Sequence, residues 1–243
     1  MGEGAAPAGG LGSGMTSIPD NSANDNTATG SGVRVAGHAF SPNPFGESFG
    51  SDGAYTAPDA PEYDFAEESF SISFWAKGAF GEFDILANKR VGGRPFWQAE
   101  PTPGGGFTWN IRDAAGNNAE FNIGGALDNN WHHFVLLRNA DTNEIRGYRD
   151  GVFAGSAAEG HVGSIATDTP LGIGAGSNGS DPYNGQVDDF RIYNVALTAA
   201  DAAAIYNNGD GDLVIIPEPG TLTLAALGLL SLGLARWRRR RGK

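Results

Sequence analysis

The clearest pattern in the chain is the alternation of apolar and polar residues that is typical of β-strands. In the segment 70–75, the three residues Phe70, Ile72 and Phe74 fall on one side of a strand, and the residues between them fall on the other. Similar short segments follow at 83–87, 96–100, 107–112, 119–123, 131–138, 145–149, 152–154 and 170–174. Many short strands at regular spacing predict an all-β antiparallel sandwich of the jelly-roll type.

A longer predicted strand, 185–197, closes this region and leads into a short helix. Simple alternation places Asp188 on the same side of the strand as Phe190 and Ile192, and therefore facing the core. A buried carboxylate without a partner is strongly unfavourable. We therefore expect Asp188 to be paired with backbone donors, an arginine or a metal ion.

Two local signals fix turns and ends. Asp150-Gly151 lies between two predicted strands, and this dipeptide favours a two-residue type I′ hairpin turn because both residues tolerate positive φ angles. Thr198-Ala-Ala-Asp201 matches a capping box, which predicts a helix that begins there and ends near Tyr206. Gly209 is a plausible terminator of this helix.

The C-terminal segment has a different character. Pro217-Glu218-Pro219 precedes the uncharged run 221–235, which an arginine cluster follows. Extended to Trp237, the run just reaches the roughly 17–25 residues that span a bilayer. Such a cluster stays cytoplasmic, so the rest of the chain is expected on the opposite side of the membrane. A buried core helix is disfavoured because the run is not amphipathic and no acidic partners for the arginines lie nearby.

These patterns divide the chain into three parts. Residues 1–15 are rich in Gly and Ala and are predicted to be a disordered leader, residues 16–212 the β-domain, and residues 213–243 a tail with a transmembrane helix at 221–237. Within residues 1–216 there are 10 basic and 27 acidic side chains, a net charge of −17. A body with this charge repels nucleic acid and anionic membranes, and is better suited to cations and neutral polymers. The absence of cysteine excludes disulfides, thiolate metal sites and a cysteine nucleophile.

The tail resembles a PEP-CTERM sorting signal, in which a Pro-Glu-Pro motif, an apolar span and an arginine cluster follow one another. The residues that carry the resemblance are Pro217, Glu218, Pro219, Arg238, Arg239, Arg240 and Arg241. The resemblance implies an exosortase-type enzyme that processes the chain near Pro217–Pro219 in a bacterium that makes exopolysaccharide. It also implies delivery of the body to the envelope, the cell surface or the extracellular matrix.

The body resembles the LamG-like jelly roll of the concanavalin A-like lectin and glucanase superfamily across about residues 20–208. Four segments carry this resemblance: 70–77, 130–135, 148–151 and 185–194. The family places a first strand and a signal peptide before the turn at 20–26, and neither is visible here. The expectation is a misplaced start or a fragment of an exported protein.

The resemblance also implies a structural calcium ion, since jelly rolls of this family often hold one between an early loop and the closing strand. Asp52 precedes a glycine in the matching turn, and Asp188 is its predicted partner. In the alternative interpretation, Asp52 only shapes the turn and Asp188 accepts backbone hydrogen bonds. Asp181 and Asn184, in a nearby Gly/Asn loop, are weaker candidates for the same ion.

Catalysis is not favoured. Enzymes with this sandwich carry Glu-x-Asp-x-Glu on one strand, and here Glu82 and Asp84 are followed by Leu86, so a second catalytic glutamate is missing. His132 and His133 follow Trp131 in a family strand motif, where such residues mostly serve packing and hydrogen bonding.

Sugar binding requires aromatic rings that stack on pyranose faces. Trp97, Trp109 and Tyr183 are candidates, together with Tyr55, although an aromatic residue at strand spacing is more often part of a core. We therefore predict a non-enzymatic exported protein whose jelly roll binds a glycan or another envelope partner. A laminarinase-like glycoside hydrolase and a purely structural adhesion module are the alternatives.

Overall fold

The described part of the protein is a β-sandwich with one short α-helix. The computed structural model describes residues 14–18, 26–36, 47–49, 53–78, 84–90, 92–93, 95–103, 105–125 and 127–208. One layer contains, in spatial order, β12 (Val152–Ala158), β11 (Glu144–Arg149), β10 (His132–Asn139), β5 (Phe70–Gly78), β14 (Gly185–Tyr193) and β3 (Glu47–Phe49). The other contains β2 (Ala28–Ala36), β4 (Ala54–Ala57), β13 (Leu171–Ile173), β6 (Ala87–Lys89), β7 (Phe96–Thr102), β8 (Gly106–Arg112) and β9 (Asn118–Ile123).

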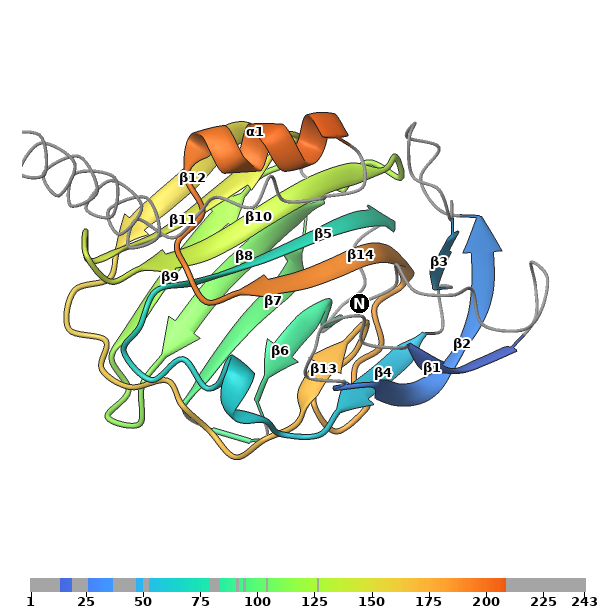
Figure 1. Ribbon diagram of the computed structural model, residues 1–243, viewed down its shortest axis with the longest axis horizontal. Coiled ribbons are helices and arrows are strands. Elements are labelled where there is room, and N and C mark those ends of the chain that lie inside the picture. The colour runs from blue at the N-terminus through green and yellow to red at the C-terminus, as the bar shows by residue number, and fades with distance from the viewer. Residues whose placement is uncertain are drawn as a thin grey trace, which may run out of the picture. The chain divides into compact units, whose positions relative to one another are not determined.

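All pairings between these strands are antiparallel, and β2 joins the layers because it pairs with both β3 and β4. Strand β1 (Gly14–Ile18) pairs with β2, and a 3-10 helix, η1 (Pro61–Tyr63), follows β4. The two layers lie face to face in Figure 1. This arrangement confirms the predicted all-β antiparallel sandwich, and it is consistent with a jelly roll.

The core lies between the layers and is rich in aromatic rings. Phe70 and Phe74 of β5 face Trp97, Phe107 and Trp109 of the opposite layer, with ring centroids 5.9–6.1 Å apart. The indole Nε1 of Trp109 donates to the backbone oxygen of Leu137 in the opposite layer at 3.2 Å, so this buried N–H group keeps a partner. The alternation predicted for 70–75 is therefore confirmed, because its apolar side forms this core.

A second, smaller cluster lies under the helix. Helix α1 (Ala199–Asn208) crosses the outer side of β10, β11 and β12 (Figure 1). Ala202 and Ile205 of the helix form this cluster with Val135, Leu137, Tyr148 and Leu197. The predicted capping box is confirmed, since Thr198 Oγ1 accepts the Asp201 N–H at 3.2 Å and Asp201 Oδ2 accepts the Thr198 N–H at 2.8 Å.

The orientation predicted for Asp188 is wrong because of a β-bulge in β14. The pairing of β14 with β5 shifts between Asp188 and Arg191, and Asp189 adopts a positive φ of 49°. Asp188 therefore lies opposite Trp75, on the helix side of the layer, whereas Phe190 belongs to the core between the layers. The one extra residue turns the carboxylate away from the row in which simple alternation had placed it.

The hairpin between β11 and β12 has the predicted turn. Asp150 and Gly151 have φ angles of 52° and 74°, as a type I′ turn requires. The Asp150 carboxylate is also bonded to the ring of His132 at 2.7 Å and to the backbone N–H of His133 at 3.0 Å. His133 is buried, with its Nε2 2.9 Å from Ser73 Oγ. His132 therefore connects β10 to the β11–β12 turn, and His133 connects β10 to β5.

One buried carboxylate organises a loop beyond β8. Asp113 accepts hydrogen bonds from the backbone N–H groups of Gly116, Asn117 and Gly163, and from the Asn117 side chain, at 2.7–2.9 Å. Burial alone would raise the pKa of Asp113, but these hydrogen bonds outweigh it and lower the pKa from 3.8 to about 2. Asp113 is therefore held in its ionised form.

The chain divides into two compact units, Met1–Gly211 and Asp212–Lys243. Over the described ranges, no helix has both the length and the apolar character needed to cross a membrane. Of the predicted leader 1–15, residues 14 and 15 belong to β1, and residues 1–13 lie outside the described residues. The predicted membrane helix 221–237 and the sorting residues 217–219 and 238–241 also lie outside the described residues.

Candidate functional site

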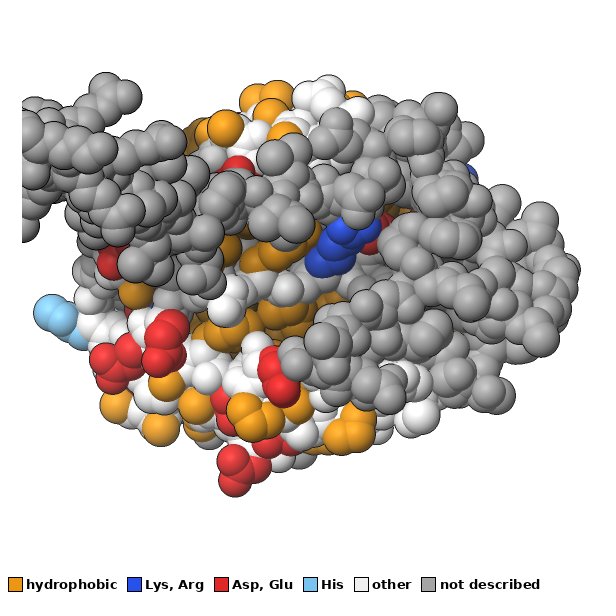
Figure 2. Space-filling view, viewed as in Figure 1, with side chains coloured by type: hydrophobic (Ala, Val, Ile, Leu, Met, Phe, Trp, Pro, Cys, Tyr) orange, Lys and Arg blue, Asp and Glu red, His pale blue; other side chains and the backbone are white. Residues whose placement is uncertain are grey.

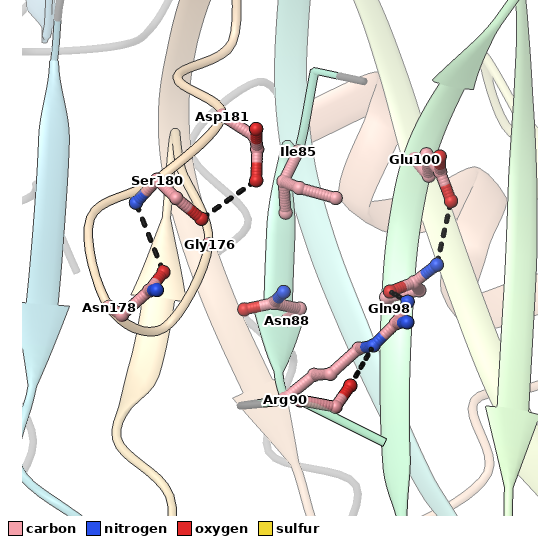
Figure 3. A pocket seen from close by; sticks show the side chains of 10 residues that line it. Ile85, Asn88, Arg90, Gln98, Glu100, Gly176, Asn178, Ser180 and Asp181 are labelled. Atoms are coloured by element: carbon pink, nitrogen blue, oxygen red, sulfur yellow. Dashed lines mark hydrogen bonds between the residues drawn. The ribbon is translucent and has the colours of Figure 1, made fainter. Parts of the chain in front are cut away.

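A polar pocket lies on the outer face of the layer that contains β6 and β7, on the side of the strands away from the core. Its volume is about 310 Å³, and the residues that line it are Ile85, Asn88, Arg90, Gly92, Gln98, Glu100, Gly176, Asn178, Ser180 and Asp181. We call it the amide pocket. Figure 3 shows Gln98 and Glu100 on one side, Asn178, Ser180 and Asp181 on the other, and Asn88 between them.

Strand alternation explains one wall. In β7, Trp97 and Ala99 face the core, so Gln98 and Glu100 point outward. The Gln98 amide accepts a hydrogen bond from Arg90 Nη1 at 2.9 Å and donates one to Glu100 Oε2 at 2.6 Å. The Arg90 guanidinium also lies over the Phe96 ring, 4.6 Å from its centroid. These contacts fix the wall before any ligand arrives.

The opposite wall is the loop 174–184, which we call the pocket loop. Its backbone is closed by hydrogen bonds such as Gly176 N–H to Ser180 O at 2.7 Å, and Ile85 N–H bonds to Asp181 O at 2.9 Å. Ser177 pins the loop to β6, since its hydroxyl donates to Asn88 Oδ1 at 2.8 Å and accepts the Arg90 N–H at 2.8 Å. The loop is therefore tied to the strands that form the rest of the pocket.

The Asn88 amide is the most informative group in the pocket. Asn88 is only 3% exposed, and its Oδ1 is bonded to Ser177, whereas its Nδ2 has no hydrogen-bond partner among the described residues. This N–H₂ group is open to the pocket and is not among the buried side-chain atoms that lack a partner, so an acceptor atom of a ligand or a water molecule can reach it. The pocket thus presents an unused donor at its base.

The carboxylates of the pocket influence one another. Burial raises the pKa of Glu100 above its ordinary value; Arg90 opposes the shift, while Asp181 and Glu120 add to it. The Asp181 carboxylate accepts a hydrogen bond from the Ser180 hydroxyl at 2.7 Å. The pocket therefore combines two carboxylates with one guanidinium and one open amide.

The aromatic residues proposed from the sequence as sugar-stacking candidates are not at the surface. Trp97, Trp109 and Tyr183 are 0–1% exposed, and Tyr55 is fully buried. The two tryptophans belong to the core between the layers because β7 and β8 direct them inward. The Tyr183 ring fills the space over Gly185, where an added Cβ would lie 2.4 Å from its Cε1 atom. These four rings present no face to a ligand in this structure.

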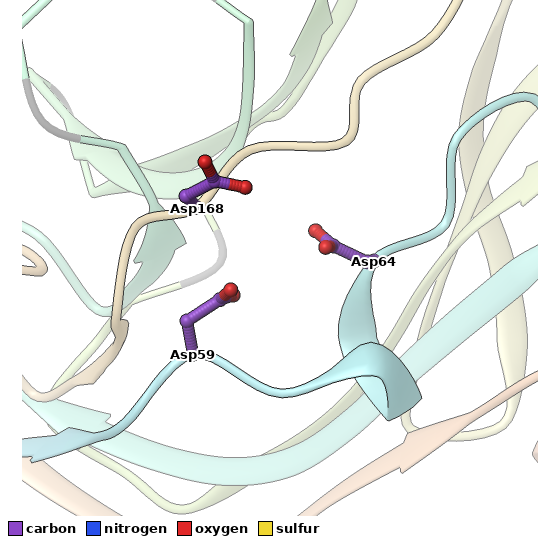
Figure 4. Close-up of side chains that lie close together, drawn as sticks. All are labelled: Asp59, Asp64 and Asp168. Atoms are coloured by element: carbon purple, nitrogen blue, oxygen red, sulfur yellow. The ribbon is translucent and has the colours of Figure 1, made fainter.

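Only one of the two predicted calcium ligands, Asp188, lies in the described part of the chain. Asp52 lies outside the described residues, and Asp188 Oδ1 accepts the Asp189 N–H at 2.9 Å. A different acidic cluster does form: the carboxylates of Asp59, Asp64 and Asp168 lie within 4.8 Å of one another and could hold a metal ion (Figure 4). No pattern in the sequence joins these three residues, since two flank η1 and the third lies about a hundred positions later.

A lysine already serves this cluster as a cation. Lys89 is 1% exposed, and its Nζ lies 2.5 Å from Asp59 Oδ1 and 2.9 Å from Asp64 Oδ1. The same ammonium lies 5.4 Å from the centroid of the Tyr63 ring. A metal ion bound among these carboxylates would be repelled by the ammonium. The cluster therefore does not suit a metal ion while Lys89 keeps this position.

The predicted enzyme residues are only partly described. Asp84 is buried, and its Oδ2 accepts the Asn184 N–H at 3.0 Å, so it anchors the end of the pocket loop. Glu82 lies outside the described residues.

Sequence reasoning named Asp181 but missed Asn88, Arg90, Gln98 and Glu100. One signal was present in β7, where polar Gln98 and Glu100 alternate with Trp97 and Ala99. This alternation indicates a polar outer face. Nothing in the sequence showed that the loop 174–184 would cover part of that face and turn it into a pocket.

Comparisons with known families give two matches. Residues 49–203, more than half of the chain, match the sequence model described as the concanavalin A-like lectin/glucanases superfamily. Residues 216–241 match that of the PEP-CTERM protein-sorting motif. The comparison with curated proteins gives no match.

Several solved structures share the fold. Domain 4 of AbnA, a GH43 extracellular arabinanase from Geobacillus stearothermophilus in complex with arabinotriose, is 15% identical with a TM-score of 0.56, over 81% of this chain and 89% of that one. The binding domain of Paraclostridial Mosquitocidal Protein 1 is 16% identical with a TM-score of 0.54, over 82% of this chain and 47% of that one. The receptor-binding domain of botulinum neurotoxin D is 16% identical with a TM-score of 0.55, over 80% of this chain and 53% of that one. The chain spans about half the length of the two toxin domains, and at these identities the likeness establishes the fold alone.

Proposed function

We propose that this chain, which belongs to the concanavalin A-like lectin/glucanase superfamily and carries a PEP-CTERM sorting motif, is an exported glycan-binding module of a bacterial envelope or matrix. The sorting motif supports an exported, envelope-associated protein. The fold supports a binding module, and the structure of a domain of the same fold from an extracellular arabinanase is a complex with arabinotriose.

The observation that carries the proposal is the open amide of Asn88 at the base of the amide pocket. Sugar hydroxyls both donate and accept hydrogen bonds, so they can satisfy the Asn88 donor and neighbouring carboxylates at the same time. The pocket offers this mixture on a preformed wall and loop, at a volume near the lower end of the roughly 300–1,000 Å³ typical of small-ligand sites. None of the described residues that line it is a tryptophan, so recognition by these residues relies on hydrogen bonds.

The test uses the compact unit Met1–Gly211 on a glycan array, followed by affinity measurements with the best ligand. Asn88→Ala should weaken binding by roughly tenfold, because a buried hydrogen bond of this kind contributes about 1 kcal/mol or more. Asn122→Ala is the matched control, since Asn122 lies on the same outer face and bonds to Thr102 and Thr108 outside the pocket. Equal losses in the two variants would refute the site, and no retention of any glycan would favour an adhesion module instead.

In this proposal the domain binds a glycan without hydrolysing it. The family motif ends in Leu86 where hydrolases have a second glutamate, and Asp84 is engaged by the backbone of Asn184. One observation favours a hydrolase as the second candidate, namely the two carboxylates of Glu100 and Asp181 in one pocket with a raised Glu100 pKa. That candidate requires release of reducing sugar from a polysaccharide, abolished by Glu100→Gln.

For the tail we propose processing by an exosortase-type enzyme near Pro217–Pro219, after transient insertion of the run 221–237 into the membrane. The match at 216–241 supports the sorting role. The arginines at 238–241 then hold the end of the chain on the cytoplasmic side.

A further inference from the structure

The amide pocket has unused hydrogen-bonding groups of both kinds. Among the described residues, Asn88 Nδ2 and Arg90 Nη2 have no acceptor, and Glu100 Oε1 and Asp181 Oδ1 have no donor. Arg90 is otherwise committed, since its Nε donates to Gly92 O at 3.0 Å. Asp181 is exposed and Glu100 is partly exposed, so water reaches both carboxylates in the free protein. A ligand that displaces this water matches the pocket best when it brings an acceptor for the amide and donors for the two carboxylates.

The charge of the pocket is not balanced. Two carboxylates line it against one guanidinium, and Glu120 adds a further negative charge close enough to act on Glu100. The guanidinium is stacked on Phe96 and bonded to Gln98, which holds it at one side of the pocket. On the face of the molecule drawn in Figure 2, acidic side chains are spread over the left and lower parts and basic ones are few. This view agrees with the net negative charge of the chain. The electrostatic complement of this pocket is a cation.

We infer that the sugar unit bound in the amide pocket carries a protonated amine, so that the ligand is a glycan with free amino sugars. This inference rests on the proposed glycan-binding function. The ammonium group of the sugar donates to Glu100 and Asp181, and a neighbouring ring hydroxyl accepts the hydrogen bond from Asn88 Nδ2. Charge-assisted hydrogen bonds of this kind are shorter and stronger than neutral ones.

Other ligand classes satisfy fewer of these groups. A bare metal ion offers no acceptor to the Asn88 donor, although it could bind the carboxylates. A sugar acid would place a third carboxylate beside Glu100 and Asp181, where like charges repel. A neutral sugar satisfies the hydrogen bonds but leaves the excess negative charge without a partner.

The inference is tested by calorimetric titration of the compact unit Met1–Gly211 with three trisaccharides of equal length: a glucosamine trimer, its N-acetylated form and a neutral glucose trimer. At neutral pH, the glucosamine trimer should bind roughly tenfold more tightly than the other two, because hydrogen bonds to charged groups contribute more than neutral ones. Glu100→Gln and Asp181→Asn should each remove most of this preference. Glu62→Gln removes an exposed carboxylate outside the pocket, so the preference should persist in this variant.

Four results would overturn the inference. Equal binding of the three trimers would refute the amine while leaving the glycan-binding function intact. Binding of none of them, together with an empty glycan array, would refute both. Equally tight binding of a lysine trimer, or an equal effect of Glu62→Gln, would show that the preference is only a general attraction of a cation to an acidic protein.

Discussion

Lys89 is the residue whose replacement should test the electrostatics of the fold most clearly. Its buried ammonium is bonded to Asp59 and Asp64, and Asp168 completes the carboxylate cluster. Lys89→Met keeps most of the side-chain length but leaves three carboxylates facing one another without a counter-charge. We expect the variant to fold with reduced stability.

The expected loss follows from the burial of the partners. Removing one member of a fully buried ion pair costs about 3–5 kcal/mol. Asp59 and Asp64 are 32% and 27% exposed, so water relieves part of this penalty. We therefore expect a loss of about 2–3 kcal/mol, which lowers the melting temperature by roughly 5–10 °C in a domain of this size.

Thermal melting of the wild type and Lys89→Met, each with a chelator and with calcium, measures the effect. In the variant, calcium can replace the missing ammonium and should restore part of the loss by binding only the folded state. Lys77→Met is the control, because Lys77 makes no contact with the cluster. Melting of Lys89→Met like the wild type, or an equal loss of stability in Lys77→Met, would show that Lys89 does not neutralise this cluster.

Three further predictions concern separate parts of the chain. Because the folded state lowers the pKa of Asp113 to about 2, its contribution is present above its ordinary pKa and is lost as the pH falls through about 4 to 2; Asp113→Asn should flatten this part of a curve of unfolding free energy against pH. If calcium bridges Asp52 and Asp188, calcium should raise the melting temperature of the wild type and Asp188→Asn should abolish the response; a variant that keeps it removes Asp188 from the site. Replacing Pro217–Pro219 with three alanines should leave the protein membrane-bound and unprocessed in an exosortase-bearing host with a working export signal, whereas maturation like that of the parent would reduce the tail to an anchor.

The sequence predicted the elements whose pattern is purely local. Strand β5 follows the alternation of Phe70, Ile72 and Phe74, and the hairpin turn at Asp150-Gly151 and the Thr198 cap depend only on neighbouring residues. The side of the layer on which Asp188 lies could not be predicted in this way. One bulge residue reverses the side on which the preceding residues of β14 lie, and simple alternation contains no signal for it.

The site was harder to predict because its parts are distant in the chain. Asn88 and Arg90 become pocket residues only because Ser177, about ninety positions later, ties the pocket loop to them. Trp97 and Trp109 had the right chemistry for sugar binding, but the two-layer core takes up large rings that point inward from β7 and β8. Composition and alternation do not show which face of a strand another segment will cover.

Whether a glycan binds in the amide pocket is tested best by locating the bound ligand on the protein. Backbone amide chemical shifts of the compact unit Met1–Gly211 should be followed while the best ligand from the glycan array is added. We predict that the shifts concentrate on β6, β7 and the pocket loop, with Asn88, Gln98 and Ser180 among the largest, and that Asn88→Ala suppresses them. Shifts confined to α1 and the outer side of β10–β12, with the pocket residues unchanged, would show that the glycan binds elsewhere.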